Sequence, residues 1–231
     1  MAYTWSKDLT TNPFDRQCCE TSNTYNVKMD YGPSTITNTP QVAEVSYVYD
    51  LPFMKAQKGI LGRVMGGWEV SGITSFISGT SATVNQNEDP FNSIAGNRGL
   101  GLAQQNGPGW WTSQSTRPNQ VSAIQKTKKL GEWFSTSSFA VASGNWGTEK
   151  NGALLGPGVQ RWDMAAIKNV NLVGPVKFQL RGEFFNAFNH ENFSGIGTGI
   201  DAGTPATGGS FGTITSGHSP RVIQIAGKLI F

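Results

Sequence analysis

The sequence predicts an all-β fold built from about six antiparallel strands, and three observations support this prediction. Several segments of the 231-residue chain alternate between apolar and polar residues, which is the period of a strand with two different faces. The links between these segments fall into a short class and a long class. The last segment is a strongly apolar strand that ends on an aromatic residue.

The expected strands follow one another with clear alternation. Within residues 42–53, Tyr47 and Tyr49 point to one side, whereas Glu44 and Asp50 point to the other. The first expected strand is short, and only its end lies in the chain. The full set of expected strands comprises residues 3–7, 42–53, 68–78, 159–172, 176–189 and 221–231.

The final strand, residues 221–231, has the length of a membrane-crossing strand, which is roughly 9–11 residues. A soluble protein rarely ends on so apolar a strand, since chain ends usually fray into water. The terminal aromatic residue fits the aromatic girdle at a membrane edge. The expected C-terminal signature on the apolar face comprises Ile223, Ile225, Gly227, Leu229 and Phe231.

Link length distinguishes the two ends of the expected sheet. The links at 53–67 and 173–175 are short, whereas those at 8–41, 79–158 and 190–219 are long. Because successive strands reverse direction, the short links lie at one end and the long links at the other. Short periplasmic turns and long extracellular loops are typical of outer-membrane barrels. The sequence therefore predicts transmembrane strands in a Gram-negative type of outer membrane, in contact with its lipid.

The second face of the strands carries many charges. Charged side chains are costly in a dry sandwich core but suit a polar barrel lumen. A soluble sandwich that turned the same face to water would also fit, so the charges alone leave both folds open. The candidate lumen-lining residues are Glu44, Asp50, Glu69, Arg161, Asp163, Lys177, Arg181, Glu183 and Lys228.

Composition excludes several other classes of protein. The net charge of +3 is small and the charges are sparse, which argues against a nucleic-acid partner. No run of 18 apolar residues is present, so we expect no transmembrane helix. Residues 1–7 lack the basic start and apolar stretch of a signal peptide. Three interpretations therefore stay open, namely a mature chain, a piece of a longer chain, or a protein that is not exported.

The chain carries several motifs in a fixed order, of which the densest is RGEFFNAFNH at 181–190. In order and spacing these motifs resemble the C-terminal part of TonB-dependent outer-membrane transporters, in particular the group with a carboxypeptidase-regulatory-like N-terminal domain, and the resemblance covers nearly the whole chain. The other matching segments are YTWSK at 3–7, SYVYDLPF at 46–53, GWEVSGI at 67–73, SGT at 78–80, WF at 133–134, FA at 139–140, LGPG at 155–158, WD at 162–163, FGTIT at 211–215 and the final strand with the preceding proline at 220–231.

The resemblance implies a single segment, residues 1–231, of a larger barrel whose plug domain and N-terminal strands lie outside this chain. Such transporters have 22-stranded barrels with a plug, and the smallest single-chain barrels have eight strands. By this resemblance the chain is the C-terminal barrel portion of a receptor that takes up an unidentified substrate. It is expected to be inactive by itself, to meet the barrel-assembly machinery through its last strand, and to depend on TonB only through the missing plug.

No motif for catalysis or for a cofactor is found. His190 opens a sequence that is not H-E-x-x-H, and two histidines without a spacing pattern nominate no catalytic triad. The glycines at 96–101 lack the G-K-[ST] of a phosphate loop. Cys18 and Cys19 are adjacent, which is not metal-site spacing, and their redox state stays open. We expect no enzyme activity, no cofactor and no metal.

The alternative interpretation is a soluble or surface-attached β-sandwich that binds glycans through aromatic loops. Trp110 and Trp111 are the candidates, because aromatic rings stack on sugars, although packing within a loop is their more ordinary role. In a sandwich the apolar strand faces would meet each other. The surroundings of those faces therefore discriminate between the two folds.

Overall fold

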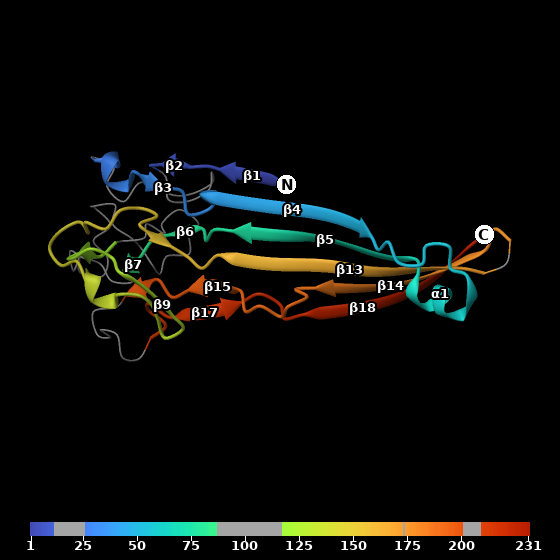
Figure 1. Ribbon diagram of the computed structural model, residues 1–231. Coiled ribbons are helices and arrows are strands. Elements are labelled where there is room, and N and C mark those ends of the chain that lie inside the picture. Colours follow the sequence, from blue (N-terminus) through green and yellow to red (C-terminus); the bar gives the residue numbers. More distant parts are fainter. Residues whose placement is uncertain (12–25, 87–116, 173, 201–208) are drawn as a thin grey trace, which may run out of the picture.

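One antiparallel sheet of six strands organises the protein (Figure 1). The structure, a computed structural model, describes residues 1–11, 26–86, 117–172, 174–200 and 209–231. Each strand pairs with the next strand of the sheet in chain order, which confirms the predicted fold class and strand number. The strands are β1 (Ala2–Trp5), β4 (Gln41–Asp50), β5 (Trp68–Ile77), β13 (Val159–Asn171), β14 (Lys177–Phe185) and β18 (Val222–Ile230).

Short and long links lie at opposite ends of the sheet, as predicted (Figure 1). The link between β13 and β14 is a tight turn, in which the Leu172 N–H donates to the Val176 carbonyl at 3.0 Å. The link between β4 and β5 holds helix α1 (Gly59–Met65), which the sequence analysis did not predict. Within the described residues, no helix combines the length and the apolarity needed to cross a membrane.

The long links pack into a unit of their own at the other end of the sheet, which the sequence predicts only as loops with short β pieces at 132–134 and 139–141. We call residues 26–40, 79–86, 117–158, 192–200 and 209–217 the loop-end unit. Its strands and 3-10 turns, with the adjoining β2 (Leu9–Thr10), are η1 (Val27–Asp30), β3 (Gly32–Pro33), β6 (Ser81–Ala82), β7 (Asn85–Gln86), β8 (Asn119–Gln120), β9 (Lys126–Lys129), β10 (Glu132–Phe134), η3 (Thr136–Ser138), β11 (Phe139–Ala140), β12 (Leu154–Leu155), β15 (Phe193–Ile196), β16 (Gly199–Ile200) and β17 (Ile214–Gly217).

The buried hydrophobic core of the described chain lies in the loop-end unit. Phe134, Phe139 and Phe211 form an edge-to-face triad with ring centroids 5.4, 5.7 and 6.1 Å apart. Val84, Leu154 and Ile200 complete the cluster. Burying one such side chain contributes about 1.5–3 kcal/mol, so this cluster helps to hold together residues that are far apart in sequence.

A cluster of buried polar side chains joins three segments of the loop-end unit. Arg117 forms an ion pair with Asp30, and both side chains are almost inaccessible to solvent. Arg117 also donates to the carbonyls of Met29 and Glu149, at 3.0 and 2.9 Å. One carboxylate oxygen of Glu149 accepts the Val84 N–H at 3.2 Å. The cluster thereby ties the region before β4 to the region before β13.

The strand register gives the sheet one apolar and one polar face. Directly opposed residues share a face, and one such row runs through Tyr47, Gly72, Met164, Phe184 and Ile223. Other sheets in the described chain are two-stranded, and none is large enough to cover this apolar face. A sandwich, in which two apolar faces meet, therefore does not describe the fold.

Lys168 is an exception on the apolar face. It lies opposite Trp68 in the ladder, and its ammonium is 5.5 Å from the centre of the Trp68 ring. The same ammonium donates a hydrogen bond to the Gly66 carbonyl, next to α1. The charge is thus satisfied at the end of the sheet that carries the short links.

Candidate functional site on the polar face of the sheet

The ladder places all nine candidate lumen residues on one face, opposite to the apolar face. Glu44, Ser75 and Arg161 are direct neighbours across β4, β5 and β13. Asp50 opposes Glu69, and the remaining five follow at even spacing along β13, β14 and β18. That this polar face lines a barrel lumen stays a prediction.

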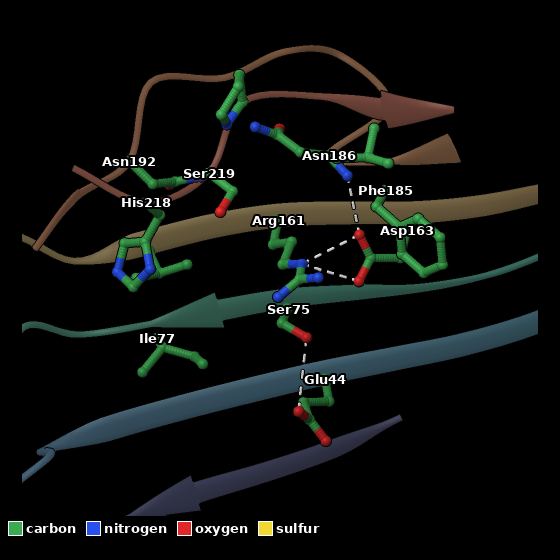
Figure 2. Close-up of a pocket in the computed structure, with 13 residues that line it drawn as sticks. Glu44, Ser75, Ile77, Arg161, Asp163, Phe185, Asn186, Asn192, His218 and Ser219 are labelled. Carbon is green, nitrogen blue, oxygen red and sulfur yellow. Dashed lines mark hydrogen bonds and ion pairs between the residues drawn. The ribbon is translucent and has the colours of Figure 1, made fainter. Parts of the chain in front are cut away.

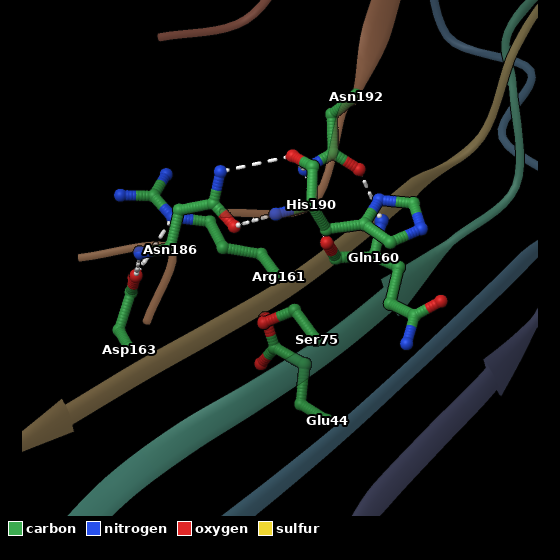
Figure 3. Close-up of polar contacts among 8 residues, drawn as sticks. All are labelled: Glu44, Ser75, Gln160, Arg161, Asp163, Asn186, His190 and Asn192. Carbon is green, nitrogen blue, oxygen red and sulfur yellow. Dashed lines mark hydrogen bonds and ion pairs between the residues drawn. The ribbon is translucent and has the colours of Figure 1, made fainter. Parts of the chain in front are cut away.

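Arg161 and Asp163 form an ion pair on the polar face, toward the long-link end of the sheet (Figures 2 and 3). The Arg161 Nε lies 3.0 Å from one Asp163 carboxylate oxygen and 2.9 Å from the other. The backbone N–H of Asn186 donates to the same carboxylate at 2.9 Å. The Arg161 side chain is about half exposed, at 52%. Its guanidinium therefore remains accessible to an anionic or carbonyl-bearing molecule.

The other charges of the polar face are less tightly paired. Arg181 and Glu183 form an ion pair at 2.8 Å along β14. Ser75 donates to Glu44 at 3.5 Å, a long and weak contact. Lys177 and Lys228 lie on the same face toward the short-link end.

A cavity of about 600 Å³ opens over this polar face, next to the loop-end unit (Figure 2). Its lining combines Glu44, Arg161 and Asp163 with His218 and Phe185. A second hollow of about 380 Å³ shares Asp163 and Phe185 and continues along the sheet past Arg181. The two hollows combine charges of both signs with apolar side chains, which suits a solute that has both polar and apolar parts.

The segment after β14 shapes the cavity wall, and here the predicted strand 176–189 runs too far. Asn186 and Asn189 have left-handed backbone, each with φ of 51°, so the strand ends at Phe185. The Asn186 side chain accepts the His190 N–H and donates to the His190 carbonyl, both at 3.0 Å (Figure 3). Asparagine tolerates this conformation better than most residues.

Asn192 continues the sheet where β14 leaves it. Its side-chain oxygen accepts the Gln160 N–H at 2.8 Å, and its side-chain nitrogen donates to the Gln160 carbonyl at 3.0 Å (Figure 3). No pattern in the sequence predicted Asn186, Asn192 or His218 as cavity residues. Asn186 lies in the dense 181–190 motif, which was the available signal, whereas nothing comparable marks Asn192 or His218.

The C-terminal signature lies as expected on the apolar face as far as Leu229. Ile223, Ile225 and Leu229 are about half to three-quarters exposed, and Phe231 follows the end of β18. Trp110, Trp111, Cys18 and Cys19 lie outside the described residues. Among the described residues, no group of three or more His, Cys, Asp or Glu side chains could hold a metal ion.

A single-layer antiparallel sheet with one largely apolar and one charged face is the arrangement found in the wall of an outer-membrane barrel. Residues 1–224 match the family model described as outer membrane beta barrel domain, and the chain belongs to this family. The family places the protein in the outer membrane. A search of curated proteins and a search of solved structures each returned no match.

Proposed function

We propose that this chain forms part of the barrel wall of a TonB-dependent receptor that takes up a substrate across the outer membrane. The polar face, with its charged cavity, turns to the lumen, and the loop-end unit faces the cell exterior. The observation that carries this proposal is the cavity over Arg161 and Asp163, which lies on the face opposite the apolar one. The resemblance of residues 181–190 to TonB-dependent transporters supports the part of the proposal in which TonB supplies the energy for uptake.

The open sheet supports a role as part of a larger barrel. In the described chain β1 pairs only with β4, and β18 pairs only with β14. Exposed edges promote aggregation unless other strands cover them. The remaining strands and a plug domain would supply the closure and the contact with TonB, and β18 would engage the barrel-assembly machinery. The role is one of binding and passage, without catalysis, cofactor or nucleic acid.

Paired cysteine variants test the orientation of the two faces in the outer membrane. Ser71 and Val70 are adjacent in β5 and point to opposite faces. In a Cys18→Ser/Cys19→Ser background, Ser71→Cys is expected to react with a charged, water-soluble maleimide, and Val70→Cys only with an apolar one. Equal reaction of both variants with the charged reagent would contradict a lumen on the polar face.

Uptake measurements test the dependence on TonB. Cells that produce the complete protein are given labelled siderophores, glycans and peptides, with TonB present or deleted. We expect accumulation of one class of solute only when TonB is present, and weaker accumulation with Arg161→Ala. Passive, TonB-independent flux through the purified protein in bilayers would overturn the proposal and indicate a simple channel.

A further inference from the structure

Helix α1 presents large apolar side chains to its surroundings. Ile60 is 86% exposed and Leu61 is 64% exposed, and Val64 and Met65 are more than half exposed. Phe53, just before the helix, is similarly open. Large apolar residues of a surface helix normally face a protein core. Here the helix turns them outward.

Glycine lies on the inward face of α1, at Gly62, and at the cap of its C-terminal end, at Gly66. Gly62 is buried, and a Cβ at this position would lie 2.9 Å from the Gln57 carbonyl carbon. A Cβ on Gly66 would lie 2.1 Å from the Met54 carbonyl oxygen. The helix therefore packs on its own link through its smallest residues. At 3.6 residues per turn, its four large apolar side chains form one outward stripe, with Arg63 at the border.

All the charged side chains of the link that carries α1 are cationic. Between Leu51 and Trp68 it contains Lys55, Lys58 and Arg63 and no acidic residue. The other 15 Lys and Arg residues of the chain balance its 15 Asp and Glu residues. The whole formal net charge of +3 thus equals the charge of this short link.

Two contacts join α1 to the apolar face of the sheet. The Trp68 indole N–H donates to the Val64 carbonyl at 3.0 Å. Lys168 donates to the Gly66 carbonyl from the neighbouring strand. Both Trp68 and Lys168 belong to the apolar face, at the end of the sheet where Figure 1 shows α1. The apolar stripe thereby adjoins the lipid-facing surface of an outer-membrane protein.

We propose that α1 is an interfacial membrane anchor, which inserts its apolar stripe at the boundary between headgroups and acyl chains while Lys55, Lys58 and Arg63 bind anionic phospholipid headgroups. Amphipathic helices with cationic borders bind membranes in this way. The anchor would fix the depth of the β4–β5 end in the phospholipid leaflet at the short-link end of the sheet. It depends on the outer-membrane location alone and not on transport.

A fluorescence experiment on the complete protein tests this anchor. The protein is extracted from outer membranes and reconstituted in phosphatidylcholine vesicles with and without phosphatidylglycerol. Leu61→Cys and Leu130→Cys, both in the Cys18→Ser/Cys19→Ser background, carry an environment-sensitive dye. Leu130 is a matched control, because it is a leucine of similar exposure, 58%, in the loop-end unit. Circular dichroism verifies that each sample contains folded sheet.

We expect a blue-shifted emission at position 61 that lipids brominated near the headgroup quench, and a water-like emission at position 130. Phosphatidylglycerol should increase the quenching at position 61. Lys55→Gln/Lys58→Gln/Arg63→Gln should lower the ratio of inserted to water-exposed helix by about five-fold per charge. The matched triple variant Lys126→Gln/Lys128→Gln/Lys129→Gln, which removes three cations from β9, should leave this ratio unchanged.

Three results would overturn the anchor in a folded protein. The first is a water-like emission at position 61. The second is a blue shift that brominated lipids do not quench, because a protein surface would then cover α1. The third is equal quenching with and without phosphatidylglycerol, which would exclude recognition of anionic headgroups. Each result leaves TonB-dependent uptake unaffected, so the two proposals fail separately.

Discussion

At the scale of single residues, Glu149 is the titratable group with the largest consequence for the loop-end unit. Burial raises its pKa from 4.5 to about 8, although the Val84 N–H and the charge of Arg117 both favour the carboxylate. Arg117 is already paired with Asp30. The second carboxylate oxygen of Glu149 is buried and has no hydrogen-bond partner within the described residues. The protonated acid therefore fits this site better than the charged form.

The raised pKa of Glu149 predicts that the loop-end unit loses stability as pH rises. The folded state holds this proton more tightly than the unfolded chain does, so the stabilisation is complete below pH 4.5 and declines until about pH 8. The expected slope of the unfolding free energy is about 1.4 kcal/mol per pH unit. Urea unfolding at several pH values across this window measures it.

Two substitutions distinguish the contribution of Glu149 to the pH dependence of stability from the contributions of other acidic residues. The glutamine in Glu149→Gln cannot ionise, so the urea midpoint of this variant is expected to change little between about pH 5 and pH 8, the range over which Glu149 titrates differently in the folded and unfolded states. Glu132→Gln, in the exposed part of β10, is expected to keep the wild-type pH dependence. An unchanged slope in Glu149→Gln would assign the pH dependence to another group.

A second residue-scale prediction concerns Asp50 and Glu69, which oppose each other across β4 and β5. Like charges in direct opposition are destabilising. Glu69→Gln is therefore expected to raise the unfolding free energy of the sheet by about 0.5 kcal/mol, measured in detergent micelles with urea. Glu44→Gln is the control, because Glu44 opposes Ser75 and not an acid; a gain of equal size there would point to net charge as the cause.

At the scale of elements, glycines under aromatic rings shape the apolar face of the sheet. Gly72 lies opposite Tyr47, and a Cβ on Gly72 would be 2.7 Å from the tyrosine oxygen and 2.6 Å from the Asp163 carbonyl oxygen. Gly182 and Gly227 lie near Phe184 and Phe178, where a Cβ would still keep 3.4 Å. Because glycine has no side chain, each aromatic ring can lie close to the backbone of the glycine beside it.

These distances predict different costs for two similar substitutions. Gly72→Ala is expected to destabilise the sheet by about 1–3 kcal/mol, because its methyl group meets a backbone oxygen that cannot move freely. Gly182→Ala is expected to be tolerated, since its nearest contact is an aromatic ring at ordinary separation. Thermal unfolding in micelles compares the two variants. Equal losses of stability would show that the close approach at position 72 adds no cost beyond that of an ordinary glycine-to-alanine substitution.

At the scale of the whole molecule, a six-stranded sheet with two free edges does not close a barrel. Single-chain barrels have eight strands or more, and the extra strand pairs of the loop-end unit do not join the main sheet in the described chain. In an outer-membrane barrel lipid covers the apolar face, and we expect further strands to cover the two edges of this sheet. The loop-end unit differs from the sheet in that its large apolar side chains form a buried core within the unit itself.

The open sheet predicts the behaviour of the 231-residue chain in isolation. After refolding in detergent micelles, we expect no shift between unheated and boiled samples on a detergent gel, and aggregation when detergent is removed. A heat-dependent shift would mean that these strands close into a stable barrel, alone or as an oligomer. Monomeric solubility without detergent would contradict the membrane-spanning sheet itself.

The sequence by itself determined the features that depend on neighbours along the chain. The period of two residues assigned Glu44, Arg161 and Arg181 to one face and Ile225 to the other, because side chains of a strand alternate strictly. Link lengths assigned the two ends of the sheet. The nine charges of the polar face were predicted in this way, and the register agrees that they share a face.

Only the tertiary structure decided the features that depend on contacts between distant residues. The cavity wall needs Asn192 to bond Gln160 across 32 positions of sequence, and the loop-end core joins Val84 to Phe211. The outward stripe of α1 follows from the packing of Gly62 on Gln57. Alternation along a strand carries no information about such contacts, because they are set by which segments the fold brings together.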